Sequence, residues 1–142
     1  MVTLSQTAAT APVGALEQGL AELERAAHHA ATQTPATGVA GALQELLGQT
    51  MVAGITGISD AKTVGRWARG EREPRAESER RLRDAFQIAT FLILAESAQT
   101  ARAWFVGMNP HLRDRAPFAI LAEDADSAPR VLAAARAFVV NG

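Results

Sequence analysis

The stretch Thr50–Gly70, TMVAGITGISDAKTVGRWARG, is the part of the chain that most restricts its fold. Gly57 suits the left-handed backbone of a tight turn, because glycine has no side chain to clash with its own carbonyl. After this glycine, Ser59 or Asp60 supplies an oxygen that can cap the start of a helix. We therefore expect two short helices joined at a glycine turn, at residues 49–56 and 59–69.

The second helix of this pair has an apolar side and a cationic side. Val64 and Trp67 are three residues apart and are expected to pack it against the first helix. The other side carries Lys62, Thr63, Arg66 and Arg69. Such pairs place a cationic helix in the major groove of DNA; the competing interpretation is a charged face that is only solvated.

DNA binding would assign different roles to these side chains. We expect Thr63 and Arg66 to contact base edges, and Lys62 and Arg69 to contact phosphates. Arg75, in the segment after the helix, is expected to contact a further phosphate. The expected DNA-binding residues are therefore Ser59, Lys62, Thr63, Arg66, Arg69 and Arg75.

Basic residues are concentrated in one part of the chain. Eight of the 14 lysine and arginine residues lie between positions 62 and 83, although the net charge is −1. A local cationic zone on a near-neutral body favours a site-directed DNA-binding protein over a general nucleic-acid coat. Part of the zone has a structural interpretation, because Glu77–Arg81 and Glu79–Arg83 have the i, i+4 spacing of helix ion pairs.

The composition indicates an all-α fold. The chain has 142 residues, is 48% hydrophobic and only 5% aromatic, and shows no period-two alternation typical of strands. The absence of cysteine excludes disulfides and thiolate sites. Because the sequence has no secretory-type leader and no apolar run of roughly 18 residues, we expect a cytoplasmic protein without a membrane segment.

No catalytic, metal or cofactor site is expected. His28 and His29 diverge by about 100° on a helix, so they do not converge on a metal ion. The acidic loop at 123–126 lacks a further carboxylate, and the sequence has no phosphate-binding glycine loop or serine nucleophile motif. These features favour a binding protein over an enzyme.

Loop and turn signals divide the chain into three segments. Residues 1–38 form an N-terminal extension, expected to be disordered over its first dozen residues and helical at 13–31 before a loop. Residues 39–98 contain the helix pair and end with a long helix at 77–98. Residues 99–142 form a smaller helical segment.

The long helix at 77–98 changes character along its length. Its start is charged, and its second half is apolar on nearly every side. Its expected core face comprises Leu82, Phe86, Ala89 and Ile93, with Phe91 and Leu92 on the flank. We expect this helix to be buried between two parts of the chain and to bridge them.

The last third of the chain has its own pattern of helices and turns. Trp104 lies in an expected helix at 100–106, and Asn109 precedes a proline in a turn. Pro117 starts another short helix, and Ser127 caps a final one. On this pattern alone, Trp104 is expected to belong mostly to the core.

Two stretches of the chain resemble the Xre/MbcA/ParS antitoxins. LGQTMVAGITGISDAKTVGRWARGEREPRAESERRLRDAFQI is similar to their Xre-type helix-turn-helix, and ARAWFVGMNPHLRDRAPFAILAEDADSAPRVLAAARAFVV looks like their C-terminal toxin-binding domain. The resemblance covers about residues 43–140. It implies that the chain neutralises a RES-domain toxin, which degrades NAD, and represses its own operon. Trp67 follows Gly57 by ten residues where many Xre sequences have nine, which predicts a second helix that starts later or is rotated by about 100°.

The resemblance also implies where a toxin binds. The expected contacts around Trp104 are Asn109, Pro110, Leu112, Arg113 and Pro117. The C-terminal region of these antitoxins lies at or near the toxin active site. This implies a second set of contacts, Phe138, Val139, Val140, Asn141 and Gly142, of which Val139–Gly142 help to occlude the NAD pocket.

The expected partners are therefore a RES-type toxin, operator DNA and a second copy of the chain. A homodimer is expected because one helix-turn-helix reads too few base pairs for operator selectivity. Toxin binding and repression are expected to be coupled through the helix at 77–98. Two alternatives remain: a protein-binding antitoxin whose helix-turn-helix is only a dimerisation scaffold, and a stand-alone repressor without a toxin.

Overall fold

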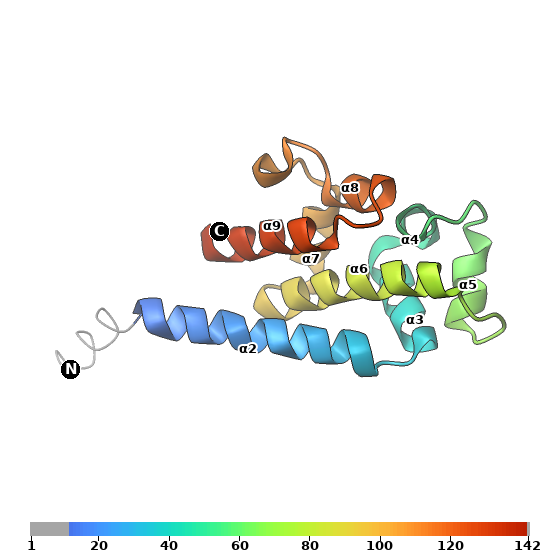
Figure 1. The fold of residues 1–142 in the computed structure, drawn as a ribbon, viewed down its shortest axis with the longest axis horizontal. Coiled ribbons are helices and arrows are strands. Elements are labelled where there is room, and N and C mark those ends of the chain that lie inside the picture. The colour runs from blue at the N-terminus through green and yellow to red at the C-terminus, as the bar shows by residue number, and fades with distance from the viewer. Residues whose placement is uncertain (1–11, 142) are drawn as a thin grey trace.

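The computed structural model describes residues 12–141 and shows an all-α protein, as the sequence predicts (Figure 1). No strand occurs among these residues. The elements are α2 (Pro12–Gln33), α3 (Ala36–Leu47), α4 (Gln49–Thr56), α5 (Lys62–Ala68), α6 (Ala76–Ala95), α7 (Ala98–Val106), the 3₁₀ turn η1 (Pro110–Leu112), α8 (Pro117–Glu123) and α9 (Ala128–Asn141). None of these helices is both long and apolar enough to cross a membrane.

Helix α6 is the centre of the molecule. It contacts α2, α3, α4, α7 and α9, and in Figure 1 it runs between α2 and α9, with α5 at its amino-terminal end. The long helix predicted at 77–98 is shorter in the structure, where α6 ends at Ala95. The Ser97 side chain accepts a hydrogen bond from the Thr100 backbone N–H and so starts α7.

The buried face of α6 agrees only in part with the predicted one: Leu82 and Ala89 are buried as expected, whereas Phe86 is half-buried. Its buried residues are Leu82, Ala85, Ile88, Ala89, Phe91 and Leu92. Phe91 and Leu92, predicted to lie on the flank, are fully buried, whereas Ile93 is 39% exposed. The reason is that α6 is covered from several directions, so its buried face is wider than one helical stripe and centred differently.

Helix α2 packs along α6 and is longer than the predicted helix at 13–31. Leu20, Ala27 and Ala31 are its buried residues. The expected loop at 32–38 is much shorter, since α3 begins at Ala36. The prediction that the first dozen residues are disordered falls, except for Pro12, outside the described residues.

Arginine side chains from α6 and α7 satisfy the carboxyl-terminal carbonyls of three other helices. Arg83 donates to the carbonyls of Ala31 and Thr34 at the end of α2, at 2.7 and 2.8 Å. Arg102 donates to the Leu46 carbonyl of α3, at 2.8 Å. Arg81 donates to the carbonyls of Leu121 and Ala122 in α8, at 2.8 and 3.0 Å. Helix ends leave such carbonyls unpaired, so these contacts tie α6 and α7 to their neighbours.

The ion pairs of α6 are only partly as predicted. The Glu79–Arg83 pair is confirmed, at 2.9 Å. The Glu77–Arg81 pair is wrong: Glu77 instead pairs with Arg80, at 2.7 Å, because the Arg81 guanidinium is occupied by α8. The basic cluster of α6 is therefore largely structural.

Replacing Arg81 with methionine is expected to lower the free energy of unfolding by about 1–3 kcal/mol. Methionine keeps much of the apolar stem but removes the donor from two part-buried carbonyls of α8. Urea denaturation followed by circular dichroism measures the change. As a control, Arg25→Met alters an exposed arginine of α2 and should change stability by less than about 0.5 kcal/mol. Equal effects of the two substitutions would contradict the structural role of Arg81.

All the helices share one hydrophobic core. Buried side chains from Leu20 in α2 to Ala135 in α9 belong to a single cluster. The three segments 1–38, 39–98 and 99–142 are thus joined through α6 and do not have separate cores within the described residues.

Candidate nucleic-acid interface

The turn between α4 and α5 has the geometry predicted for Gly57. This residue lies in the left-handed region, at φ 79° and ψ 25°. The N–H of Ile58 donates to the Ala53 carbonyl at 3.0 Å, which closes the end of α4. A Cβ atom at Gly57 would lie 2.8 Å from Nη1 of Arg81, so the glycine also makes room for that arginine.

Helix α5 begins at Lys62, later than the predicted start at Ser59. The N-cap position is Ala61, which has no capping side chain, but Asp60 just before it supplies the predicted oxygen: its Oδ1 accepts the Lys62 N–H at 3.0 Å. Ser59 is exposed in the turn and makes no such contact. The extra residue before Trp67 therefore lengthens the turn and delays the helix, which is one of the two outcomes predicted for it.

The two sides of α5 are as predicted except at Thr63. Val64 and Trp67 are buried, at 0% and 2% exposure. Thr63 is only 8% exposed, so its side chain is largely buried and is not on the outer face, although it lines the edge of a hollow that Arg66 also lines. The reason is that α5 packs closely against α3 and α4, which turns Thr63 inward together with Trp67, four residues further on.

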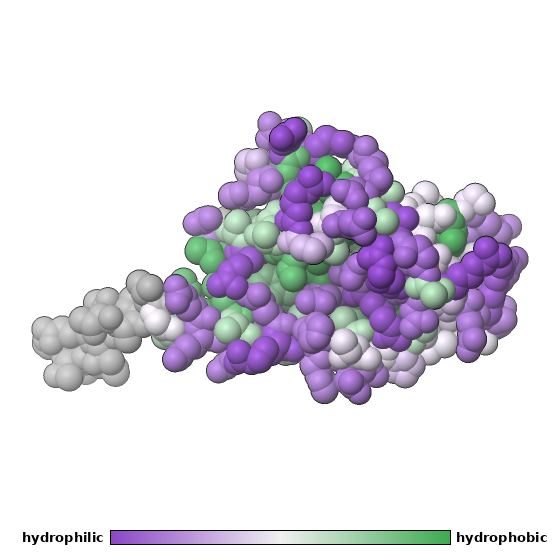
Figure 2. Space-filling model, in the orientation of Figure 1, coloured by the Kyte–Doolittle hydropathy of each residue, from purple (hydrophilic) through white to green (hydrophobic). Residues whose placement is uncertain are grey.

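The outer face of α5 and the loop after it form a cationic surface. It consists of Lys62, Arg66, Arg69, Arg72 and Arg75, and the side chains at this end of the molecule are mostly hydrophilic in Figure 2. Arg66, Arg72 and Arg75 line a hollow of about 530 Å³ beside α5, together with the carboxylates Asp60 and Glu73. Within residues 12–141, no carboxylate lies within 4.0 Å of the charged groups of Lys62, Arg72 and Arg75.

Arg72 is the functional candidate that the sequence reasoning missed. It sits in the loop between Gly70 and Pro74, where the alternation of arginine and glutamate suggested no single role. Its position after a glycine in a left-handed turn is the signal that could have identified it, since Gly70 has φ 73° and redirects the chain beside α5.

Two of the cations are held by acidic neighbours. Nη1 of Arg66 lies 3.7 Å from Oδ2 of Asp60. Arg69 donates to Glu71 through Nε at 2.6 Å and Nη2 at 3.4 Å, with both side chains exposed. The hydrogen bond from Arg69 lowers the pKa of the Glu71 carboxyl, and the same bond raises the pKa of the guanidinium. Arg69 is therefore paired with a carboxylate, in contrast to Lys62, Arg72 and Arg75.

Several residues predicted to contact a toxin are buried. Asn109 is 5% and Leu112 4% exposed, and Pro117 is fully buried. Oδ1 of Asn109 accepts the His111 N–H at 2.9 Å, which starts the 3₁₀ turn. These three side chains lie in the loop between α7 and α8 or at the start of α8 and are mostly buried, although Asn109 also lines a hollow with Trp104 and Phe138.

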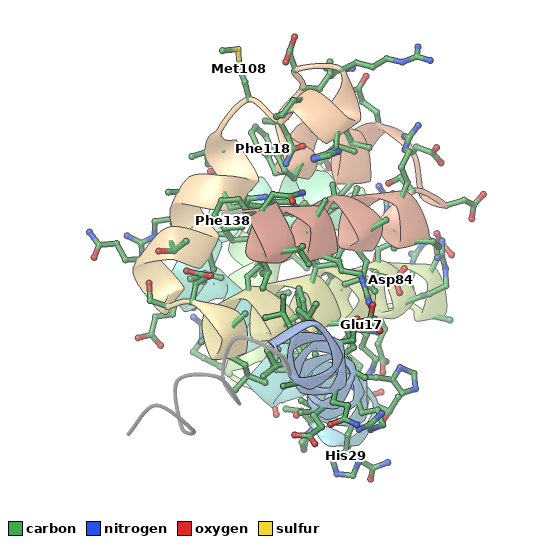
Figure 3. The ribbon with its side chains drawn as sticks, turned by 90° about the vertical axis from the view of Figure 1, so that its left-hand side faces the viewer. Glu17, His29, Asp84, Met108, Phe118 and Phe138 are labelled. Carbon is green, nitrogen blue, oxygen red and sulfur yellow. The ribbon has the colours of Figure 1, made fainter. Side chains whose placement is uncertain are left out.

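The remaining residues of that prediction are accessible to different degrees. Pro110, Arg113, Val140 and Asn141 are exposed, Phe138 and Val139 are half-buried, and Gly142 lies outside the described residues. A hollow of about 330 Å³ is lined in part by Trp104, Pro110 and Phe138. At its rim, Met108 is 82% exposed and stands out from the loop after α7 (Figure 3). The prediction that Trp104 is mostly core is confirmed, at 7% exposure, with its ring edge-on to Phe105.

The Ser127 hydroxyl, predicted to cap the last helix, donates to the end of the preceding helix. Ser127 precedes α9, and its hydroxyl donates to the carbonyls of Asp124, at 2.7 Å, and Ile120, at 3.2 Å. Its hydroxyl therefore pairs with carbonyls at the end of α8, and the next residue, Ala128, begins α9.

The histidine and carboxylate side chains do not gather into a metal site. His28 and His29 are exposed on α2, and Figure 3 shows His29 pointing away from the bundle. Between residues 12 and 141, no group of three or more His, Asp or Glu side chains is placed to hold a metal ion.

Comparison of the chain with protein-family models, curated protein sequences and solved structures gives no match. A function must therefore be inferred from the side chains and their arrangement. The cationic surface on α5 is the strongest basis for that inference.

Proposed function

We propose that this chain is a DNA-binding antitoxin, in which the cationic surface binds operator DNA and the C-terminal helices bind a RES-type, NAD-degrading toxin. The proposal assigns no reaction to the chain itself. It places the protein in the cytoplasm, where the operator and the toxin would be found.

The observation that carries the proposal is the α4–α5 pair. Gly57 joins two helices in the conformation that a helix-turn-helix requires, and α5 exposes Lys62 and Arg66 on one face. Arg72 and Arg75 extend this face beyond the helix. Cations without acidic partners can release counterions from DNA phosphates, which is the main source of affinity in such interfaces.

The toxin-binding part of the proposal rests on the resemblance and on exposed apolar side chains near the end of α9. Met108 is 82% exposed and Val140 46% exposed, and they belong to the segment that resembles a toxin-binding domain. Met108 lines a hollow together with Phe138 of α9, and exposed apolar side chains beside a hollow are typical of protein–protein contact sites. A homodimer is part of the proposal, because a seven-residue α5 reads only a short half-site.

Two assays test the proposal separately. Operator binding is measured by fluorescence anisotropy with the duplex upstream of the chain's own gene, against a duplex of scrambled sequence. Toxin binding is measured by co-expression with the protein of the adjacent reading frame, followed by pull-down and assay of NAD. We expect tighter binding to the upstream duplex and a stable complex that protects NAD. Equal binding to both duplexes would contradict the proposed operator binding. Loss of NAD in the presence of the chain would contradict the proposed neutralisation of a toxin.

A further inference from the structure

A small hollow lies between α7, the loop that follows it and α9. It has a volume of about 330 Å³, and its lining includes Trp104 of α7, Met108 and Pro110 of the loop, and Phe138 of α9. Figure 3 shows Met108 and Phe138 on the same side of the molecule. The volume is at the lower end of the ~300–1,000 Å³ typical of small-molecule sites, so the hollow suits a ligand of few atoms.

Trp104 contributes a hydrogen-bond donor that has no acceptor. Its indole Nε1 is the one buried side-chain nitrogen or oxygen without a hydrogen-bond partner in the described part of the chain. The residue itself is only 7% exposed. An unpaired buried N–H has lost its hydrogen bonds to water, so an acceptor that reaches it gains more than it would at the surface.

Asn109 contributes a second donor to the same hollow. Its Oδ1 accepts the His111 N–H at 2.9 Å, which fixes the orientation of the amide. Its Nδ2 then faces away from that bond and donates to no acceptor within residues 12–141. Since a carbonyl oxygen has two lone pairs, one such oxygen can accept from both an indole and an amide N–H.

The charge of the lining selects the kind of acceptor. No lysine, arginine, aspartate or glutamate of the described residues lines the hollow, and most of its wall is apolar. Moving a carboxylate out of water is costly without a cation beside it, whereas a neutral carbonyl needs only the donors. The rings of Trp104 and Phe138 add flat apolar surface, which favours a planar ring as the body of the ligand.

We infer that this hollow binds a small, neutral, ring-bearing carboxamide, with Trp104 and Asn109 donating to its carbonyl oxygen and Phe138 packing on its ring. Nε1 of Trp104 is covered, so the ligand displaces a side chain at the rim to reach it. Met108 is 82% exposed and unbranched, so it can move aside and then pack over the ligand. The inference depends on neither DNA binding nor toxin binding.

Benzamide is the probe, and benzoate is its charged counterpart of nearly the same shape. The chain has two tryptophans, so a ¹H–¹⁵N spectrum holds two indole N–H signals, and Trp67→Phe identifies that of Trp104. We expect benzamide to move the Trp104 signal downfield and to saturate it with a dissociation constant of about 1 mM, as befits so small a ligand. Benzoate should bind roughly tenfold more weakly or worse, because no cation offsets its charge.

Ala103→Leu tests whether the hollow is the site. Ala103 is an exposed residue of α7 that lines the hollow, so the larger side chain fills the space from outside the core and leucine keeps the helix. We expect the affinity for benzamide to fall roughly tenfold. Ala98→Leu is the matched control: it adds the same atoms at an exposed position of α7 that does not line the hollow, and it should bind benzamide as the wild type does. Circular dichroism melting checks that both variants remain folded.

Three outcomes would overturn the inference. The first is a Trp104 signal that stays in place at about 10 mM benzamide, or that shifts without saturation together with the Trp67 signal. The second is equal affinity for benzamide and benzoate, which would contradict a neutral acceptor. The third is an Ala103→Leu variant that binds benzamide as tightly as the Ala98→Leu variant. Each result is independent of the duplex and NAD assays, so failure here leaves the proposed function to its own tests.

Discussion

Replacing Lys62, Arg72 and Arg75 together with glutamine is expected to weaken duplex binding by roughly a hundredfold at ~0.1 M salt. These cations of the proposed interface have no carboxylate within 4.0 Å among residues 12–141. Each is expected to displace one counterion from DNA, so the slope of log K against log salt should become shallower by about 2.7. Fluorescence anisotropy across a salt series measures both quantities.

A charge-matched control separates a local effect from the effect of net charge. Glutamine at Arg25, Arg130 and Arg136 also removes three positive charges, but from α2 and α9. In Figure 1 these helices lie apart from α5, so this variant should keep the wild-type salt slope. If both triple variants lost affinity equally, long-range charge would explain binding and the cationic surface would not be the interface.

Local signals in the sequence predict the helix pair but not the burial of Thr63 on its second helix. The turn at Gly57 depends on the backbone conformation of one residue. The burial of Trp67 depends on its large apolar ring. Both were predicted correctly. The position of Thr63 instead depends on how α5 packs against α3 and α4, which side-chain chemistry does not specify. A small hydroxyl-bearing residue is compatible with either face of such a helix.

Polar residues near a predicted interface show a second limit of prediction from the sequence. Asn109 beside a proline is equally suited to contact a partner or to cap a turn, and the structure uses its oxygen for the cap. Arg81 shows the same ambiguity: its spacing predicts an ion pair, yet it meets carbonyls of α8 forty positions away.

The shared core implies that the parts of the chain unfold together, which the three predicted segments do not imply. Side chains of α6 contact both the α4–α5 end and the C-terminal helices, so neither part can lose α6 and keep its own core. The chain contains two tryptophans, with Trp67 at the first end and Trp104 in the C-terminal part. Variants that keep one tryptophan each, Trp104→Phe and Trp67→Phe, can therefore report the unfolding of each part separately.

Phe91→Ala is expected to lower the free energy of unfolding by about 3–5 kcal/mol, a large part of the ~5–15 kcal/mol typical of a domain. Phe91 is fully buried in α6, and the truncation leaves a cavity at the centre of the shared core. Urea denaturation of the two single-tryptophan variants, with and without Phe91→Ala, measures the change. Because the core is continuous, both tryptophans should report one common midpoint that falls by the same amount. If Trp104 lost its midpoint while Trp67 kept it, the two parts would be separate folding units, and coupling between DNA and toxin binding through α6 would lose its physical basis.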